Sequence, residues 1–122
     1  MSILTFQAKQ TARQWIDDHF TELSTWHQHI WNLAEPAWRE FESAAWYVDL
    51  LTSYGFTVES GSAGMPTAFC AEWTHGEGPT LLTYAEYDAV PGNCQAPDTR
   101  AAAREGLDTH APCLLYTSPS PR

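Results

Sequence analysis

The hydrophobic residues of this 122-residue chain change their spacing at Gly55, and this change separates a helical part from a strand-forming part. Before Gly55, apolar side chains recur every three or four residues, which is the spacing of amphipathic helices. A first stripe predicts a helix over residues 6–33. A second stripe predicts a helix from Pro36 to Tyr54, because proline is favoured at the first helical position and Gly55 suits the left-handed conformation that ends many helices.

After Gly55, apolar and polar residues alternate, which is the spacing of strands. Residues 56–59 and 67–73 alternate in this way, and Thr80–Tyr84 is a compact apolar run typical of a buried strand. Two helices followed by strands indicate an α/β fold class. We therefore expect two N-terminal helices packed on a partial sheet that includes residues 67–73 and 80–85.

The charge balance excludes two classes of partner. Six basic residues stand against fifteen acidic ones, which gives a net charge of −9. Binding to nucleic acid or to an anionic membrane surface requires a basic surface, so we expect neither partner. The sequence has no recognisable secretory signal, no apolar run long enough for a membrane span, and three cysteines without CxxC spacing. These features predict a cytoplasmic protein.

Two carboxylates directly follow the apolar run at 80–84. Glu86 and Asp88 stand just past the end of the predicted strand, where open α/β sheets build their sites. Asp88 is the first candidate for a catalytic or metal-site residue. The alternative for Asp88 is a structural cap of the turn at Pro91–Gly92, and the alternative for Glu86 is an ordinary exposed glutamate.

Four blocks of sequence occur in an order typical of one enzyme family. The blocks are residues 35–45, 51–58, 64–69 and 85–92. They resemble the N-terminal portion of zinc-dependent amidohydrolases of the aminoacylase and carboxypeptidase kind, in particular the aminobenzoyl-glutamate and amino-acid-conjugate hydrolases. The resemblance implies an α/β sandwich as the catalytic domain of a zinc peptidase, of which this chain is an incomplete part. It also implies two zinc-like ions, hydrolysis of the amide bond of an N-acyl amino acid or peptide, and a homodimer formed through a further domain.

The same resemblance bears on single residues. It implies that Asp88 lies against the metal centre, and that Glu86 stands where relatives carry a histidine. The segment Thr109–Pro112 resembles the opening of a metal-ligand stretch, which makes His110 a weaker metal candidate beside Glu86. Because the further ligands and the glutamate base of the family have no counterparts in residues 1–122, we expect this chain alone to bind no metal and to be inactive.

The family pattern breaks at Cys113. The last ten residues match no hydrolase segment and read as the translation of a transposase-type sequencing adaptor, although a genuine terminus rich in serine and proline is the alternative. We therefore expect residues 1–112 to be the N-terminal part of the catalytic domain, and 113–122 to be a non-native tail without stable structure. The alternative to the enzyme is a small acidic α+β module whose aromatic surfaces bind a protein partner.

Overall fold

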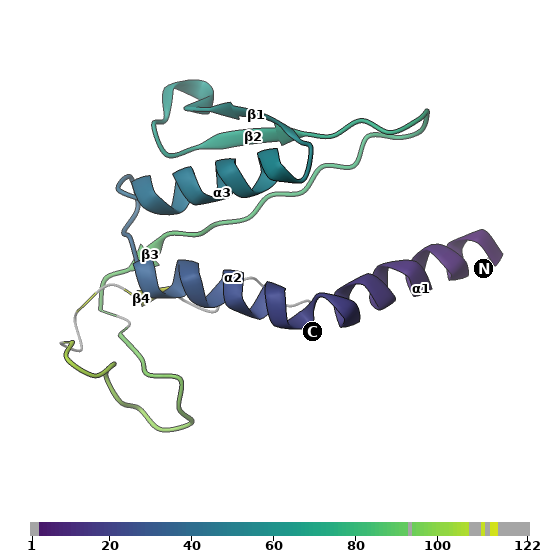
Figure 1. Ribbon diagram of the computed structural model, residues 1–122. Helices are drawn as coiled ribbons and strands as arrows, with labels where there is room; N and C mark the ends of the chain where they lie inside the picture. Colours follow the sequence, from purple (N-terminus) through teal and green to yellow (C-terminus); the bar gives the residue numbers. More distant parts are fainter. Residues whose placement is uncertain (1–2, 93, 108–110, 112, 115–122) are drawn as a thin grey trace. The chain divides into compact units, whose positions relative to one another are not determined.

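The computed structural model describes residues 3–92, 94–107, 111 and 113–114, and the chain divides into two compact units between Asn32 and Leu33 (Figure 1). Within the described residues it has three α-helices and two small antiparallel sheets of two strands each. This combination confirms the α/β class expected from the change of hydrophobic spacing. Among the helices described, none combines the length and the apolar character needed to cross a membrane.

The first unit consists of α1 (Ile3–Asp18) and nearly all of α2 (Phe20–Leu33). The sequence predicted one continuous helix, but the structure interrupts it at His19. The His19 N–H donates to the Trp15 carbonyl oxygen at 3.1 Å, and the Nδ1 atom of the same residue lies 2.7 Å from that oxygen. A side chain that competes for a carbonyl of the helical ladder disturbs the helix locally, and this explains the break.

The second unit begins with a turn and α3 (Phe41–Ser53). The prediction that Pro36 opens this helix is wrong. Pro36 instead forms a parallel bridge with Ala89, a residue far along the chain, and a turn follows in which Trp38 has a positive φ of 67°. The prediction for the helix end is confirmed. Gly55 has a φ of 86°, and the N–H of Phe56 donates to the Leu51 carbonyl, as in a Schellman motif.

A hairpin of β1 (Thr57–Ser60) and β2 (Phe69–Glu72) follows α3, and a short 3₁₀ turn, η1 (Ser62–Gly64), lies between its strands. The strands are antiparallel, with Thr57 opposite Glu72 and Ser60 opposite Phe69. Helix α3 packs against this hairpin (Figure 1). The predicted strands near 56–59 and 67–73 are therefore present, and they form the sheet on which the second helical stripe lies.

The predicted strand at Thr80–Tyr84 is wrong. These residues have no regular secondary structure, run as an extended trace (Figure 1) and pair with no strand of the described chain, and Leu81 and Leu82 are 92% and 94% exposed. An apolar run becomes a buried strand only when other strands flank it and other elements cover its faces. The composition of the run carries no information on whether those neighbours are present.

A second pair of strands involves the end of the chain. Strand β3 (Ala89–Val90) pairs antiparallel with β4 (Cys113–Leu114), with Ala89 opposite Leu114. The first two residues of the predicted unstructured tail thus take part in a sheet, because their backbone groups complete hydrogen bonds with β3. The rest of the predicted tail, 115–122, lies outside the described residues.

Candidate functional site

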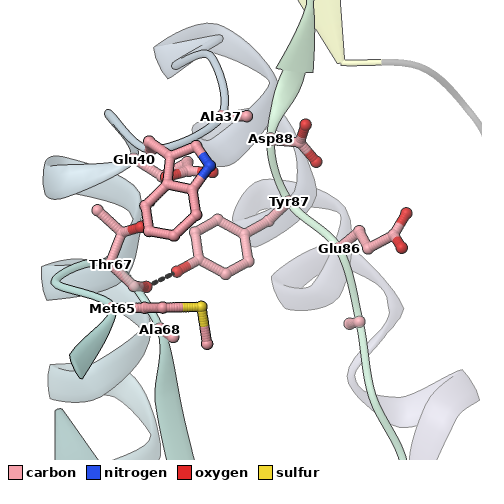
Figure 2. Close-up of a pocket in the computed structure, with 10 residues that line it drawn as sticks. Ala37, Glu40, Met65, Thr67, Ala68, Glu86, Tyr87 and Asp88 are labelled. Atoms are coloured by element: carbon pink, nitrogen blue, oxygen red, sulfur yellow. Dashed lines mark hydrogen bonds between the residues drawn. The ribbon is translucent and has the colours of Figure 1, made fainter. Parts of the chain in front are cut away.

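The second unit contains a pocket with a volume of about 580 Å³ beside the extended segment that leads into β3 (Figure 2). It lies between this segment, the turn before α3 and the chain that enters β2. The residues that line it are Ala37, Trp38, Glu40, Met65, Thr67, Ala68, Ala85, Glu86, Tyr87 and Asp88. Both residues singled out from the sequence, Glu86 and Asp88, thus line one pocket, and their carboxylates point from the segment away from Met65 and Thr67 on the other wall (Figure 2). The third candidate, His110, is outside the described residues.

The backbone around Asp88 is attached to the rest of the unit on either side of that residue. On one side, the hydroxyl of Tyr87 donates a hydrogen bond to the carbonyl oxygen of Thr67. On the other side, the N–H of Ala89 donates to the carbonyl oxygen of Glu35 at 2.7 Å. Asp88 therefore lies between two fixed neighbours.

Alternation along the extended segment places the two carboxylates together. Side chains two residues apart in extended chain share a face, and their Cα atoms are about 7 Å apart. Figure 2 shows Tyr87 reaching towards Thr67, while Glu86 and Asp88 point from the opposite side of the segment. Glu86 is exposed and Asp88 is half-buried. The alternative of a turn cap stays a prediction, and Pro91 itself has no N–H that could donate to Asp88.

A buried polar pair supports the Tyr87 side of the pocket. The hydroxyl of Thr67 donates to Oε2 of Glu40 at 2.7 Å, and both side chains are buried. Burial, together with the negative charge of Glu40 and the nearby Tyr47 and Glu35, raises the pKa of Tyr87 to about 12. The Tyr87 phenol therefore stays protonated, and remains a hydrogen-bond donor, to a higher pH than an ordinary tyrosine.

Aromatic rings hold the Tyr87 side chain from α3 and β2. Its ring centroid lies 5.3 Å from that of Tyr47 and 6.0 Å from that of Phe69, and these last two rings are 5.9 Å apart. Such spacings are typical of favourable ring pairs. Sequence reasoning missed Tyr87, and the signal that was available is its position between two acidic residues in a segment where alternate residues face opposite ways.

Glu35 connects the start of α3 to the same segment. Its carboxylate accepts hydrogen bonds from the N–H groups of Glu42 at 3.0 Å and Ser43 at 2.8 Å, and thereby caps the helix. Burial alone would raise the pKa of Glu35, but the interactions with Ser43, Glu42 and Phe41 outweigh it and hold the pKa below its ordinary value of 4.5. Since the backbone carbonyl of Glu35 also binds Ala89, one residue attaches both α3 and β3.

The pocket has too few metal-binding side chains to hold zinc, the metal that the resemblance implies. Structural zinc sites take four protein ligands and catalytic sites usually three. Among the residues that the structure describes, no group of three or more His, Cys, Asp and Glu side chains is arranged to hold a metal ion. Glu86 and Asp88 supply two carboxylates on one face, so the described residues do not fit a complete zinc site.

Comparison with known proteins gives a partial similarity. No family model and no solved structure matches the chain. The chain is similar to a subunit of the p-aminobenzoyl-glutamate hydrolase of Escherichia coli (strain K12), with 38% identity over 66 residues. The match covers 54% of this chain and 14% of the relative, so the chain spans a small part of the protein that it resembles. This similarity supports a relationship to proteins of the amidohydrolase type.

Proposed function

We propose that this chain is the N-terminal part of the catalytic domain of a metal-dependent amidohydrolase that cleaves the amide bond of an N-acyl amino acid or peptide. The observation that carries the proposal is the pair of carboxylates, Glu86 and Asp88, on one face of a fixed segment at a pocket. The partial similarity to a hydrolase of p-aminobenzoyl-glutamate supports the same chemistry.

The lining of the pocket suits such a substrate. Trp38 and Met65 are exposed apolar residues that line the pocket, and they offer a surface for an acyl group, while the two carboxylates point from the opposite side of the segment. Asp88 is the proposed catalytic carboxylate, because an acidic group beside the reacting atoms orients the groups that activate water. Hydrolysis adds water to the acyl carbon, breaks the C–N bond and delivers a proton to the leaving amine. The metal ligands beyond Glu86 and Asp88 would come from outside the described residues.

The reading frame in nucleic acid from the source tests the first part of the proposal. Continuation beyond Pro112 into a segment with glycine, histidine and further acidic ligands is the expected result. The protein encoded by that frame should hydrolyse p-aminobenzoyl-glutamate, and Asp88→Asn should lower kcat/KM by about 10- to 100-fold, the range for groups that orient metal ligands. A native stop codon directly after Arg122 would contradict the proposal.

A binding measurement tests the pocket in the 122-residue chain itself. We expect p-aminobenzoyl-glutamate to bind, and we expect Trp38→Ala to weaken its binding in calorimetric titrations. Trp73→Ala is the matched control, because Trp73 is similarly exposed, at 58% against 66% for Trp38, but does not line the pocket. If the two substitutions weakened binding equally, the ligand would bind at a site other than this pocket.

A second candidate function is a protein-interaction module, and one observation favours it. The segment Thr80–Tyr84 exposes Leu81, Leu82 and Tyr84, whose side chains are 92%, 94% and 85% accessible. Contiguous exposed apolar residues often mark contact surfaces. The source reading frame separates the two functions, since a stop after Arg122 favours the module and a continuing hydrolase sequence favours the enzyme.

A further inference from the structure

We propose that Tyr87 is a positioning residue, whose hydroxyl and ring fix the segment 86–89 so that Glu86 and Asp88 are presented together on its opposite face. The catalytic meaning of this role rests on the proposed function. The anchoring itself is a property of the fold and is tested separately.

The first argument is that Tyr87 is where this stretch of chain becomes attached. Strand β2 ends at Glu72 and β3 begins at Ala89. Within the described chain, residues 80–88 form no hydrogen bond between backbone groups. The bond from the Tyr87 hydroxyl to the Thr67 carbonyl is therefore the first hydrogen bond that ties the extended segment back to the unit.

The second argument is that the anchor is directional. The ring of Tyr87 packs against Tyr47 and Phe69, and its hydroxyl reaches a backbone carbonyl, so both the position and the rotation of the side chain are set. Because neighbouring side chains of extended chain face opposite ways, fixing Tyr87 on one face fixes Asp88 on the other.

The third argument concerns charge. Glu86 and Asp88 share a face and carry like charges, and their repulsion favours a rearrangement that separates them. Tyr87 opposes this rearrangement with a neutral hydroxyl and an aromatic ring, which add no further charge. The Thr67 residue that receives its hydrogen bond is itself fixed, since its hydroxyl binds the buried Glu40 carboxylate.

The experiment uses the 122-residue chain and compares Tyr87→Phe with Tyr84→Phe by NMR. Both substitutions remove one phenolic hydroxyl from the same segment, but Tyr84 is 85% exposed and serves as the control. Two readouts are followed: the exchange rate of the Ala89 amide, and the three-bond couplings that report the χ1 rotamer of Asp88. Exchange of the α3 amides records any general loss of stability.

We expect Tyr87→Phe to raise Ala89 exchange about tenfold, the factor that corresponds to loss of one hydrogen bond of about 1.4 kcal/mol. We also expect it to average the Asp88 couplings while α3 exchange stays unchanged, and we expect Tyr84→Phe to change none of these. Asp88 couplings in Tyr87→Phe equal to those of the wild type would overturn the proposal. So would a change that appears equally in α3, because a purely structural role predicts that result.

A milder substitution serves if Tyr87→Phe does not fold. Phe69→Leu keeps the Tyr87 hydroxyl and loosens the ring packing, so it should change Ala89 exchange and the Asp88 couplings in the same direction by a smaller factor. No change in either readout would overturn the proposal. A chain that binds no p-aminobenzoyl-glutamate but shows these NMR changes would contradict the proposed function and leave the positioning role intact.

Discussion

Glu35 gives the sharpest test of how this fold is held together. Helix α3 has Glu40 at its N-cap position, but the side chain of Glu40 makes no capping hydrogen bond. The carboxylate of Glu35 supplies that cap instead, through the N–H groups of Glu42 and Ser43. Loss of a capping side chain costs about 0.5–2 kcal/mol. Because solvent screens this carboxylate, we expect about 1 kcal/mol for Glu35→Ala.

The expected loss corresponds to a decrease in Tm of roughly 4–8 °C for a unit of this size. Differential scanning calorimetry at pH 7 measures it. Glu42→Gln is the control, since Glu42 also lies in the first turn of α3 but its side chain does not cap the helix. It removes only a charge near the helix dipole, and because Glu42 is exposed we expect the low end of such effects, about 0.3 kcal/mol. Equal losses for Glu35→Ala and Glu42→Gln would refute the capping argument.

The pH dependence gives the same prediction a second readout. The folded pKa of Glu35 lies below its ordinary value of 4.5, so its stabilising contribution is complete above that value. The contribution is lost as the pH falls through the lowered folded pKa. The difference in Tm between wild type and Glu35→Ala should therefore shrink in strongly acidic solution, and a difference that grows there would contradict the assignment.

Three further predictions concern the pocket and the extended segment. The pKa of Tyr87 is raised from 10 to about 12, so the folded state resists ionisation of this phenol and the wild type should lose stability between about pH 10 and pH 12. We expect chemical denaturation to show a loss of roughly 1 kcal/mol after solvent screening, and Tyr87→Phe should lack this loss. Trp38→Gly should raise the unfolding free energy by about 0.5–1 kcal/mol, because glycine adopts the positive φ of 67° without strain; a lower thermal midpoint would contradict this. Leu81→Ser combined with Leu82→Ser should leave the free energy of unfolding, measured by urea denaturation, unchanged within about 0.5 kcal/mol, since both side chains are almost fully exposed. A larger loss would mean that they pack in solution.

Local sequence signals predicted those features whose causes are local. The end of α3 follows from Gly55 and its neighbours, and the hairpin follows from alternation over short ranges. The start of α3 was placed wrongly because proline at a first helical position is permitted but not required. The partner of Pro36 is Ala89, and nothing in the sequence near Pro36 specifies that pairing.

The candidate site also has some residues that local sequence signals predict and others whose roles depend on distant parts of the chain. Glu86 and Asp88 were found because acidic residues after an apolar run are visible in the sequence. Tyr87 was missed because its role depends on Thr67, which lies 20 residues earlier and acts through a backbone carbonyl that every residue type possesses. The buried bond between Thr67 and Glu40 spans 27 residues, and no sequence spacing indicates it.

The exposed segment at Thr80–Tyr84 has a consequence for the chain under digestion. Proteases bind their substrates as extended strands, and an accessible extended run with leucine and tyrosine side chains meets that requirement. Limited digestion by an enzyme that cuts after such residues should therefore nick the backbone here first. Thr67 then lies on one fragment and Tyr87 on the other. Whether the fragments stay together through a gel-filtration column would report how strongly they are joined by the ring contacts, the Tyr87 hydroxyl bond and the backbone bond from Ala89 to Glu35.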